Sequence, residues 1–181
     1  ERLNVLVLGG SQAAKIFAEI LPDVFKECIT QNIRLKIYQH CLLNQNEQLN
    51  SFYKSNNIEF ETFNFTNNII DYFPKVNFAI TRSGSSVLAE LTNANIPFVS
   101  VPLPSSADNH QLKNAKYYKD KFNTFLLEEK DLKNKLFTLI KEIYNNNSLL
   151  KNIVYNQRQH SDKNVYNNIN EVLKKVIDEK D

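Results

Sequence analysis

The sequence predicts one α/β domain with a doubly wound parallel sheet of six strands. Short apolar runs alternate with longer segments of helical period through the first two-thirds of the 181 residues. Several runs, such as Val5–Leu8 and Phe78–Ile80, lack polar alternation, which is typical of strands covered by helices on both faces. The length fits one domain, and neither an internal repeat nor a linker-like stretch divides it.

Predicted strands and helices alternate along the first two-thirds of the chain. The predicted strands are Asn4–Leu8, Ile33–Tyr38, Glu59–Phe63, Phe78–Thr81, Phe98–Val101 and Thr124–Leu127. The predicted helices between them are Gln12–Thr30, Gln45–Ser55, Ile69–Phe73, Ser86–Asn93 and Asn109–Lys119. The pattern is then helical only, at Leu132–Tyr144, more weakly at Leu149–Gln159, and at Val165–Asp178. One apolar face on these later helices predicts that they pack on the sheet.

Composition excludes several classes of protein. The net charge of +2 is too balanced for the dense cationic face of a nucleic-acid binder, so we expect no nucleic-acid partner. No run approaches the roughly 18 apolar residues of a membrane-spanning helix, and the N-terminus lacks a signal-peptide layout. Cys28 and Cys41 are expected to be buried, reduced thiols. We therefore expect a cytoplasmic protein.

Glycine is the informative residue, because the chain has only three, at positions 9, 10 and 84. A chain that avoids glycine should keep it where backbone geometry or close approach to a ligand requires it. The segments Gly9–Gln12 and Arg82–Ser85 each follow a predicted strand and enter a predicted helix. Because parallel strands end at one edge of a sheet, both turns should face one crevice. Backbone N–H groups at helix N-termini there suit phosphate.

The helix after the second turn carries Glu90, one turn from its start. A carboxylate there can accept hydrogen bonds from two ribose hydroxyls. The alternative is a solvated acid that favours the helix dipole, with Ser85 or Ser86 as the N-cap.

A third segment, 105–115, follows the fifth predicted strand and its Pro-Leu-Pro kink. Asp108 is expected to cap the next helix, which puts His110 and Gln111 in its first turn at the same edge of the sheet. The amide of Gln111 offers a donor and an acceptor, which suits sugar hydroxyls. The alternative is an ordinary capped helix that exposes both side chains.

Other nucleotide chemistries are disfavoured. The chain has no P-loop motif, and the dinucleotide fingerprint is incomplete because the second strand ends in Gln39-His40 without a carboxylate. A dehydrogenase is therefore the least favoured alternative. No D-x-D pair is present to hold a metal on a diphosphate, so we expect neither a metal nor a cofactor.

These segments, in this order, resemble the MurG family of peptidoglycan N-acetylglucosaminyltransferases, two-domain enzymes of glycosyltransferase family 28 with the GT-B fold. V-L-V-L-G-G-S-Q-A-A at 5–14 resembles the family's G-G-S-x-G-A turn. T-R-S-G-S-S-V-L-A-E at 81–90 resembles its R-S-G-A-x-T-x-x-E block, and A-D-N-H-Q-L-K-N-A at 107–115 its D-x-x-Q-x-x-N-A block. The segment 63–66 lies where the family recognises uracil.

The resemblance implies that residues 1–181 form a Rossmann-like donor-binding domain, one half of a GT-B enzyme, for UDP-N-acetylglucosamine. The first turn would meet the diphosphate, the second the phosphate and ribose, Glu90 the ribose hydroxyls, and His110 with Gln111 the sugar. Arg82 matches an arginine taken to support the nucleotide. The implied site residues are Gly10, Ser11, Gln12, Thr66, Arg82, Ser83, Gly84, Ser85, Glu90, His110 and Gln111.

The chain also departs from the family. Ala13 replaces a glycine of the first turn, and Gln39–Leu42 differs from the family's His-Gln-Ser/Thr-Gly, so this loop is assigned no role. Nothing in the chain matches the family's N-terminal domain, which binds the lipid-linked acceptor, touches the membrane and carries the proposed base. We therefore expect no catalytic residue in this chain, which would be a domain fragment or half of a split enzyme.

The implied activity is transfer of N-acetylglucosamine, with inversion, from UDP to lipid I to form lipid II. That reaction would connect the chain to peptidoglycan synthesis, cell shape and cell division, at the inner face of the cell membrane when full-length. Alone, the chain is expected to bind donor and transfer nothing. The alternatives are a non-catalytic nucleotide-sugar-binding subunit of a split transferase and an enzyme like the UDP-GlcNAc 2-epimerases.

Overall fold

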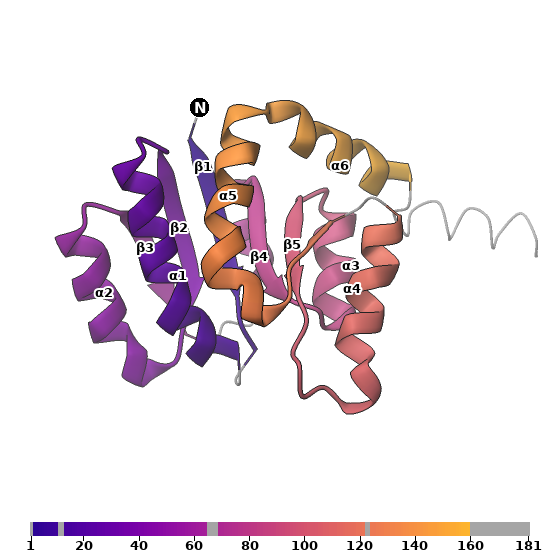
Figure 1. Cartoon of the computed structure of the whole chain (residues 1–181), viewed down its shortest axis with the longest axis horizontal. Coiled ribbons are helices and arrows are strands. Elements are labelled where there is room, and N and C mark those ends of the chain that lie inside the picture. The colour runs from indigo at the N-terminus through magenta and orange to yellow at the C-terminus, as the bar shows by residue number, and fades with distance from the viewer. Residues whose placement is uncertain (1, 11–12, 65–68, 122–123, 160–181) are drawn as a thin grey trace, which may run out of the picture.

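The computed structural model describes residues 2–10, 13–64, 69–121 and 124–159. It contains the predicted parallel sheet of six strands, and their order is β3-β2-β1-β4-β5-β6. The strands are β1 (Leu3–Leu8), β2 (Leu35–His40), β3 (Glu59–Phe63), β4 (Phe78–Arg82), β5 (Phe98–Val101) and β6 (Phe125–Leu126). Figure 1 shows this sheet in the middle of the molecule, between layers of helices.

Helices cover both faces of the sheet, as the uniformly apolar strands predicted. They are α1 (Ala13–Thr30), α2 (Asn46–Ser55), α3 (Ser85–Asn93), α4 (His110–Asp120), α5 (Leu132–Asn145) and α6 (Asn147–Gln159). Val5 and Val7 of β1 belong to the core beneath α1, α2 and α5, whereas Leu6 between them belongs to the core beneath α3. Alternate side chains of one strand therefore build two separate cores. Helix α6 packs on α3 and α5 (Figure 1).

Three of the helix ends use the same Asn-Ile pair. After α1, Asn32 has a left-handed backbone (φ 60°) and the Ile33 N–H donates to the Cys28 carbonyl at 2.9 Å. The closure is of the Schellman type, in which glycine usually takes the left-handed position. The same geometry recurs at two other helix ends, in the pairs Asn57-Ile58 and Asn95-Ile96. Ile33 therefore belongs to a helix cap, and the second strand begins at Leu35 and not at Ile33.

Other expectations differ in detail. The expected helix Ile69–Phe73 is a 3-10 helix, Ile69–Lys75, because Pro74 lacks the N–H that a regular α-helix would use. The last strand is reduced to two residues, Phe125–Leu126. The expected helix Val165–Asp178 lies outside the described residues. Cys28 and Cys41 are free and buried, as expected. Among the helices that the structure describes, none is both long and apolar enough to cross a membrane.

Candidate functional site

The two glycine turns follow neighbouring strands. β1 pairs in parallel with β4, with Leu8 opposite Thr81, so Gly9-Gly10 and Ser83-Gly84 leave the same edge of the sheet side by side. The strand order reverses at this point, because β2 and β3 lie on one side of β1 while β4 to β6 lie on the other. Ligands of open α/β sheets bind at such a switch point, outside the carboxyl ends of the strands.

The fold itself does not need glycine at Gly10 or Gly84. No glycine has a positive φ in the described part of the chain, where asparagine and aspartate take the left-handed positions. A Cβ added to Gly84 (φ −66°) would meet only Val87 Cγ1, at an ordinary 3.7 Å, and one added to Gly10 would meet nothing within 4 Å. Of the two reasons for keeping glycine in this glycine-poor chain, close approach of a ligand is the one that fits.

Ser83 of the second turn is held from three sides. Its N–H donates to Gln111 Oε1 (3.2 Å), its carbonyl accepts from Asn114 Nδ2 (3.0 Å), and its hydroxyl bonds to the Ser100 hydroxyl (2.7 Å). Gln111 Oε1 also accepts from the Leu103 N–H (3.0 Å). Ser83 is fully buried and its polar groups are engaged, so it positions the turn and presents no side-chain atom to a ligand.

Asn114 holds the second turn, a role that the sequence analysis missed. It lies three residues after Gln111 on α4, and residues three apart share a helix face. The signal was present in the D-x-x-Q-x-x-N-A block. The chain contains 26 asparagines, so a single Asn in a motif carries little weight as a sign of function.

Helix α3 begins at the carboxyl edge of the sheet, and its N-cap residue forms no side-chain cap. Gly84 is its N-cap, so the alternative in which Ser85 or Ser86 caps the helix is wrong on this point. The first N–H groups of any α-helix have no intrahelical acceptor, and no side chain in the described ranges caps them here. Ser85 is exposed beside them. Free amides, a hydroxyl and the positive end of the helix dipole together suit an anion.

Glu90 lies on the same helix, and its side chain is exposed. It forms no ion pair with any residue in the described ranges. Its carboxylate is therefore free to accept hydrogen bonds from a ligand, as the ribose hypothesis requires.

The backbone before α4 has an unusual conformation. Asp108 and Asn109 are both left-handed (φ 49° and 53°), and Asn109, without a side-chain hydrogen bond, is the N-cap. The prediction that Asp108 caps this helix is therefore wrong. Two consecutive left-handed residues other than glycine cost about 1 kcal/mol or more each. The strained turn places exposed His110, whose Nδ1 lies 2.8 Å from the Ala107 carbonyl, directly before Gln111.

Arg82 is buried next to the second turn, and its side chain is not open to a ligand. Its guanidinium forms an ion pair with Glu129, donates to the carbonyls of Val101 (3.4 Å) and Pro102 (3.3 Å), and lies 5.1 Å from the Phe17 ring centroid. Only 6% of the residue is exposed. In this conformation Arg82 acts on the site through the turn that it supports.

The first turn is held by His40, another residue that the sequence analysis left without a role. His40 ends β2, and its Nδ1 lies 2.6 Å from the carbonyl oxygen of Gly9. Tertiary pairing across 31 residues creates this contact, so no local pattern could predict it. Three predicted site residues, Ser11, Gln12 and Thr66, lie outside the described residues.

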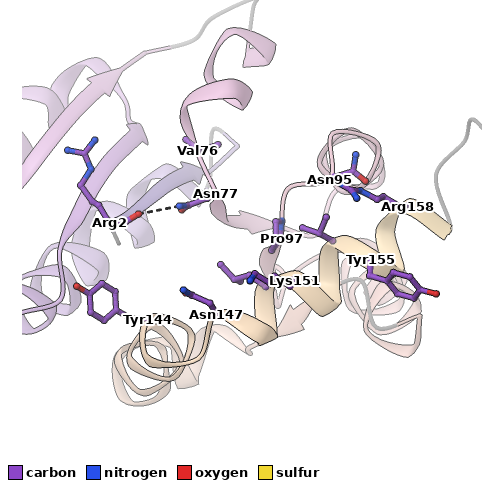
Figure 2. Close-up of a pocket in the computed structure, with 12 residues that line it drawn as sticks. Arg2, Val76, Asn77, Asn95, Pro97, Tyr144, Asn147, Lys151, Tyr155 and Arg158 are labelled. Atoms are coloured by element: carbon purple, nitrogen blue, oxygen red, sulfur yellow. Dashed lines mark hydrogen bonds between the residues drawn. The ribbon is translucent and has the colours of Figure 1, made fainter.

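A separate pocket of about 490 Å³ lies at the opposite edge of the sheet, between the strand starts and α6 (Figure 2). Its cationic residues are Arg2, Lys151 and Arg158. The Arg2 guanidinium is already paired with Glu59, at 2.7 Å. Neither glycine turn contributes to this pocket, so it is distinct from the predicted donor site.

Comparisons with known proteins agree with the geometry. Residues 4–176 match the glycosyltransferase family 28 C-terminal domain. The chain is 38% identical to a Pelagibacter ubique protein and 32% identical to a Rickettsia bellii protein. Both are named UDP-N-acetylglucosamine--N-acetylmuramyl-(pentapeptide) pyrophosphoryl-undecaprenol N-acetylglucosamine transferase. These alignments cover 99% and 94% of this chain but 50% and 49% of the relatives, so the chain spans about half the length of the curated relatives it matches.

Solved structures give the same result. Acinetobacter baumannii MurG superposes with a TM-score of 0.77 at 26% identity, over 89% of this chain and 46% of that one. S. aureus MnaA with UDP superposes with a TM-score of 0.61 at 11% identity, over 96% and 47%, which shows a shared fold alone. The split-subunit and epimerase alternatives are not favoured by these comparisons. The chain belongs to the glycosyltransferase family 28 C-terminal domain family.

Proposed function

We propose that this chain binds UDP-N-acetylglucosamine, as the donor half of a transferase that adds N-acetylglucosamine to lipid I in peptidoglycan synthesis. The observation that carries the proposal is the pair of glycine turns on neighbouring strands, at glycines that the fold does not need. Family membership and the activity for which the relatives are named support the choice of donor and acceptor.

The donor would lie along the carboxyl edge of the sheet. Gly10 and the α3 N-terminus at Gly84-Ser85 would meet the diphosphate, with Ser11 and Gln12 beside the first turn. Glu90 would accept the ribose hydroxyls, and Thr66 would adjoin the uracil. The Nε2 group of Gln111 is left to donate to the sugar, because its Oε1 is engaged by two backbone amides. His110 would lie at the sugar as well.

In transfer with inversion, negative charge grows on the departing UDP as the acceptor hydroxyl attacks the anomeric carbon. Amides and dipoles already fixed at the position of that charge stabilise the transition state. A helix N-terminus contributes about 0.3–1 kcal/mol at an exposed site, so direct hydrogen bonds would supply most of the stabilisation. The acceptor site, the general base and the membrane contact would come from a further domain. Roles in cell shape and division, at the inner face of the membrane, would follow from the same reaction.

Isothermal titration calorimetry with UDP-N-acetylglucosamine tests the proposal. We expect saturable binding, no heat with NADH, and a loss of about tenfold to a hundredfold in affinity for Glu90→Ala, the range for hydrogen bonds to a charged group. Glu142→Ala, at an exposed glutamate on α5, is the matched control and should bind as the wild type does. Absence of binding at millimolar donor would refute the proposal.

A further inference from the structure

We infer that His40 is a positioning residue for the diphosphate: its ring orients the Gly9–Gly10 peptide so that the Gly10 N–H points into the crevice. The inference rests on the proposed function and adds to it a residue to which the motifs assign no role. It starts from the 2.6 Å contact between His40 Nδ1 and the Gly9 carbonyl oxygen.

The contact shows which ring nitrogen acts as the donor. A carbonyl oxygen only accepts hydrogen bonds, so Nδ1 of His40 must carry the hydrogen. The ring is half-buried, and its centroid lies 5.9 Å from that of Phe63. Phe63 in turn stacks on Tyr72 at 4.3 Å. The aromatic neighbours limit how the imidazole can move, so its N–H is a fixed donor and not a freely rotating one.

The direction of the Gly10 N–H follows from peptide geometry. In a planar trans peptide the C=O of one residue and the N–H of the next point in opposite directions, and the described chain has no cis peptide. β1 lies between β2 and β4. The Gly9 carbonyl points toward His40 at the end of β2, so the Gly10 N–H points toward the β4 side, where Ser83 and Gly84 form the second turn.

A fixed donor matters here because the backbone of the first turn, at Gly9 and Gly10, can adopt several conformations. Gly9 and Gly10 lack side chains, and a Cβ at Gly10 would meet no atom within 4 Å. Within the described ranges, the His40 contact is the one hydrogen bond recorded to either glycine. Without it, the peptide could rotate and turn its carbonyl oxygen toward the diphosphate. A hydrogen bond to the carbonyl also polarises the peptide and strengthens its N–H as a donor.

Two substitutions of nearly equal shape test the inference. In His40→Asn the side-chain amide places a donor at the same distance from the backbone as Nδ1, whereas His40→Leu has the same branching and no donor. NMR titrations would measure the affinities of wild type and both variants for UDP and for uridine, which lacks phosphate. Thermal unfolding followed by circular dichroism would check that both variants fold.

We expect His40→Leu to lose about tenfold in UDP affinity and to keep its uridine affinity, the size of effect that one hydrogen bond to a charged group produces. His40→Asn should stay within about threefold of wild type for both ligands. Equal losses for UDP and uridine, an unchanged UDP affinity in His40→Leu, or no rescue by His40→Asn would overturn the inference. If wild type binds neither UDP nor UDP-N-acetylglucosamine, the proposed function fails, and the inference fails with it.

Discussion

The two glycine turns occupy equivalent places in the fold but are held very differently. Side chains from α4 and β5 bind the backbone and the hydroxyl of Ser83 in the second turn, and Arg82 lies buried beneath it. In the described part of the first turn, a single contact from His40 reaches Gly9. The second turn is therefore part of the folded core, whereas the first is set by one side chain. Removing the side chains that hold the second turn should change stability and binding together, whereas removing the one that holds the first should change binding alone.

The largest expected effect is at Arg82. Arg82→Ala leaves Glu129 without its partner and removes the donor to two carbonyl groups, so we expect the free energy of unfolding to fall by about 3 kcal/mol. Urea unfolding would measure this fall. Lys135→Ala, which breaks the exposed pair with Asp131, is the control and should cost under about 0.5 kcal/mol. Equal costs for the two variants would show that the second turn does not depend on its buried ion pair.

Gln111 has two roles that different substitutions can separate: its Oε1 holds the second turn, and its Nε2 is proposed to bind the sugar. Gln111→Ala leaves the Ser83 and Leu103 amides without their acceptor, so we expect a loss of about 1–3 kcal/mol in unfolding free energy. Gln111→Glu keeps an acceptor oxygen but has no amide donor. It should retain most of the stability, measured by urea unfolding, and lose the preference for UDP-N-acetylglucosamine over UDP, measured by calorimetry. A Gln111→Glu variant with unchanged preference would remove Gln111 from the sugar site.

The glycines themselves should be nearly neutral for folding. Gly84→Ala and Gly10→Ala place a methyl group in ordinary contact or in open space, and the φ of Gly84 is −66°. We expect the unfolding free energy to change by less than about 1 kcal/mol. UDP affinity should nevertheless fall in both, because the methyl group occupies the space of the ligand. Thermal unfolding and calorimetry on the same samples would check this, and a variant that loses stability and keeps affinity would contradict it.

The smallest effect concerns the thiols. Burial raises the pKa of Cys28 to about 12 and also raises the pKa of Cys41, which follows His40 on the side of the first turn. Both thiols should therefore react slowly with a disulfide reagent at pH 8 in the native protein, since the thiolate is the reactive form. A thiol that is neutral in the folded state ionises first in the unfolded chain, so Cys28 lowers stability as pH rises from 9 toward 12. Rapid native labelling of either thiol would contradict the buried geometry.

The sequence predicted the strands well because both-face burial leaves a clear mark, an apolar run such as Val5–Leu8. It also located both glycine turns, since glycine is rare here. It did not predict the roles of Asn32 and its two counterparts, because left-handed asparagine has no distinct sequence mark in an asparagine-rich chain.

The contacts that hold the two turns could not be predicted from local sequence patterns. Gln39-His40 lacks the carboxylate of a dinucleotide site, and the contact of the imidazole with Gly9 depends on the pairing of β2 with β1, which no local pattern encodes. The burial of Ser83 likewise depends on Ser100 and on α4, which come later in the chain. Serine in a turn suggests exposure, but here tertiary packing reverses that preference.

The strand order has a consequence for the dynamics of the domain. β1 pairs with β2 after one short crossover, but its other neighbour is distant in the chain, with Val5 opposite Phe78. The hydrogen bonds between β1 and β4 thus join two groups of strands, β1 to β3 and β4 to β6, and a nucleotide bound by both turns would link the two groups. When the nucleotide is bound, hydrogen–deuterium exchange should slow most for the amides that pair β1 with β4.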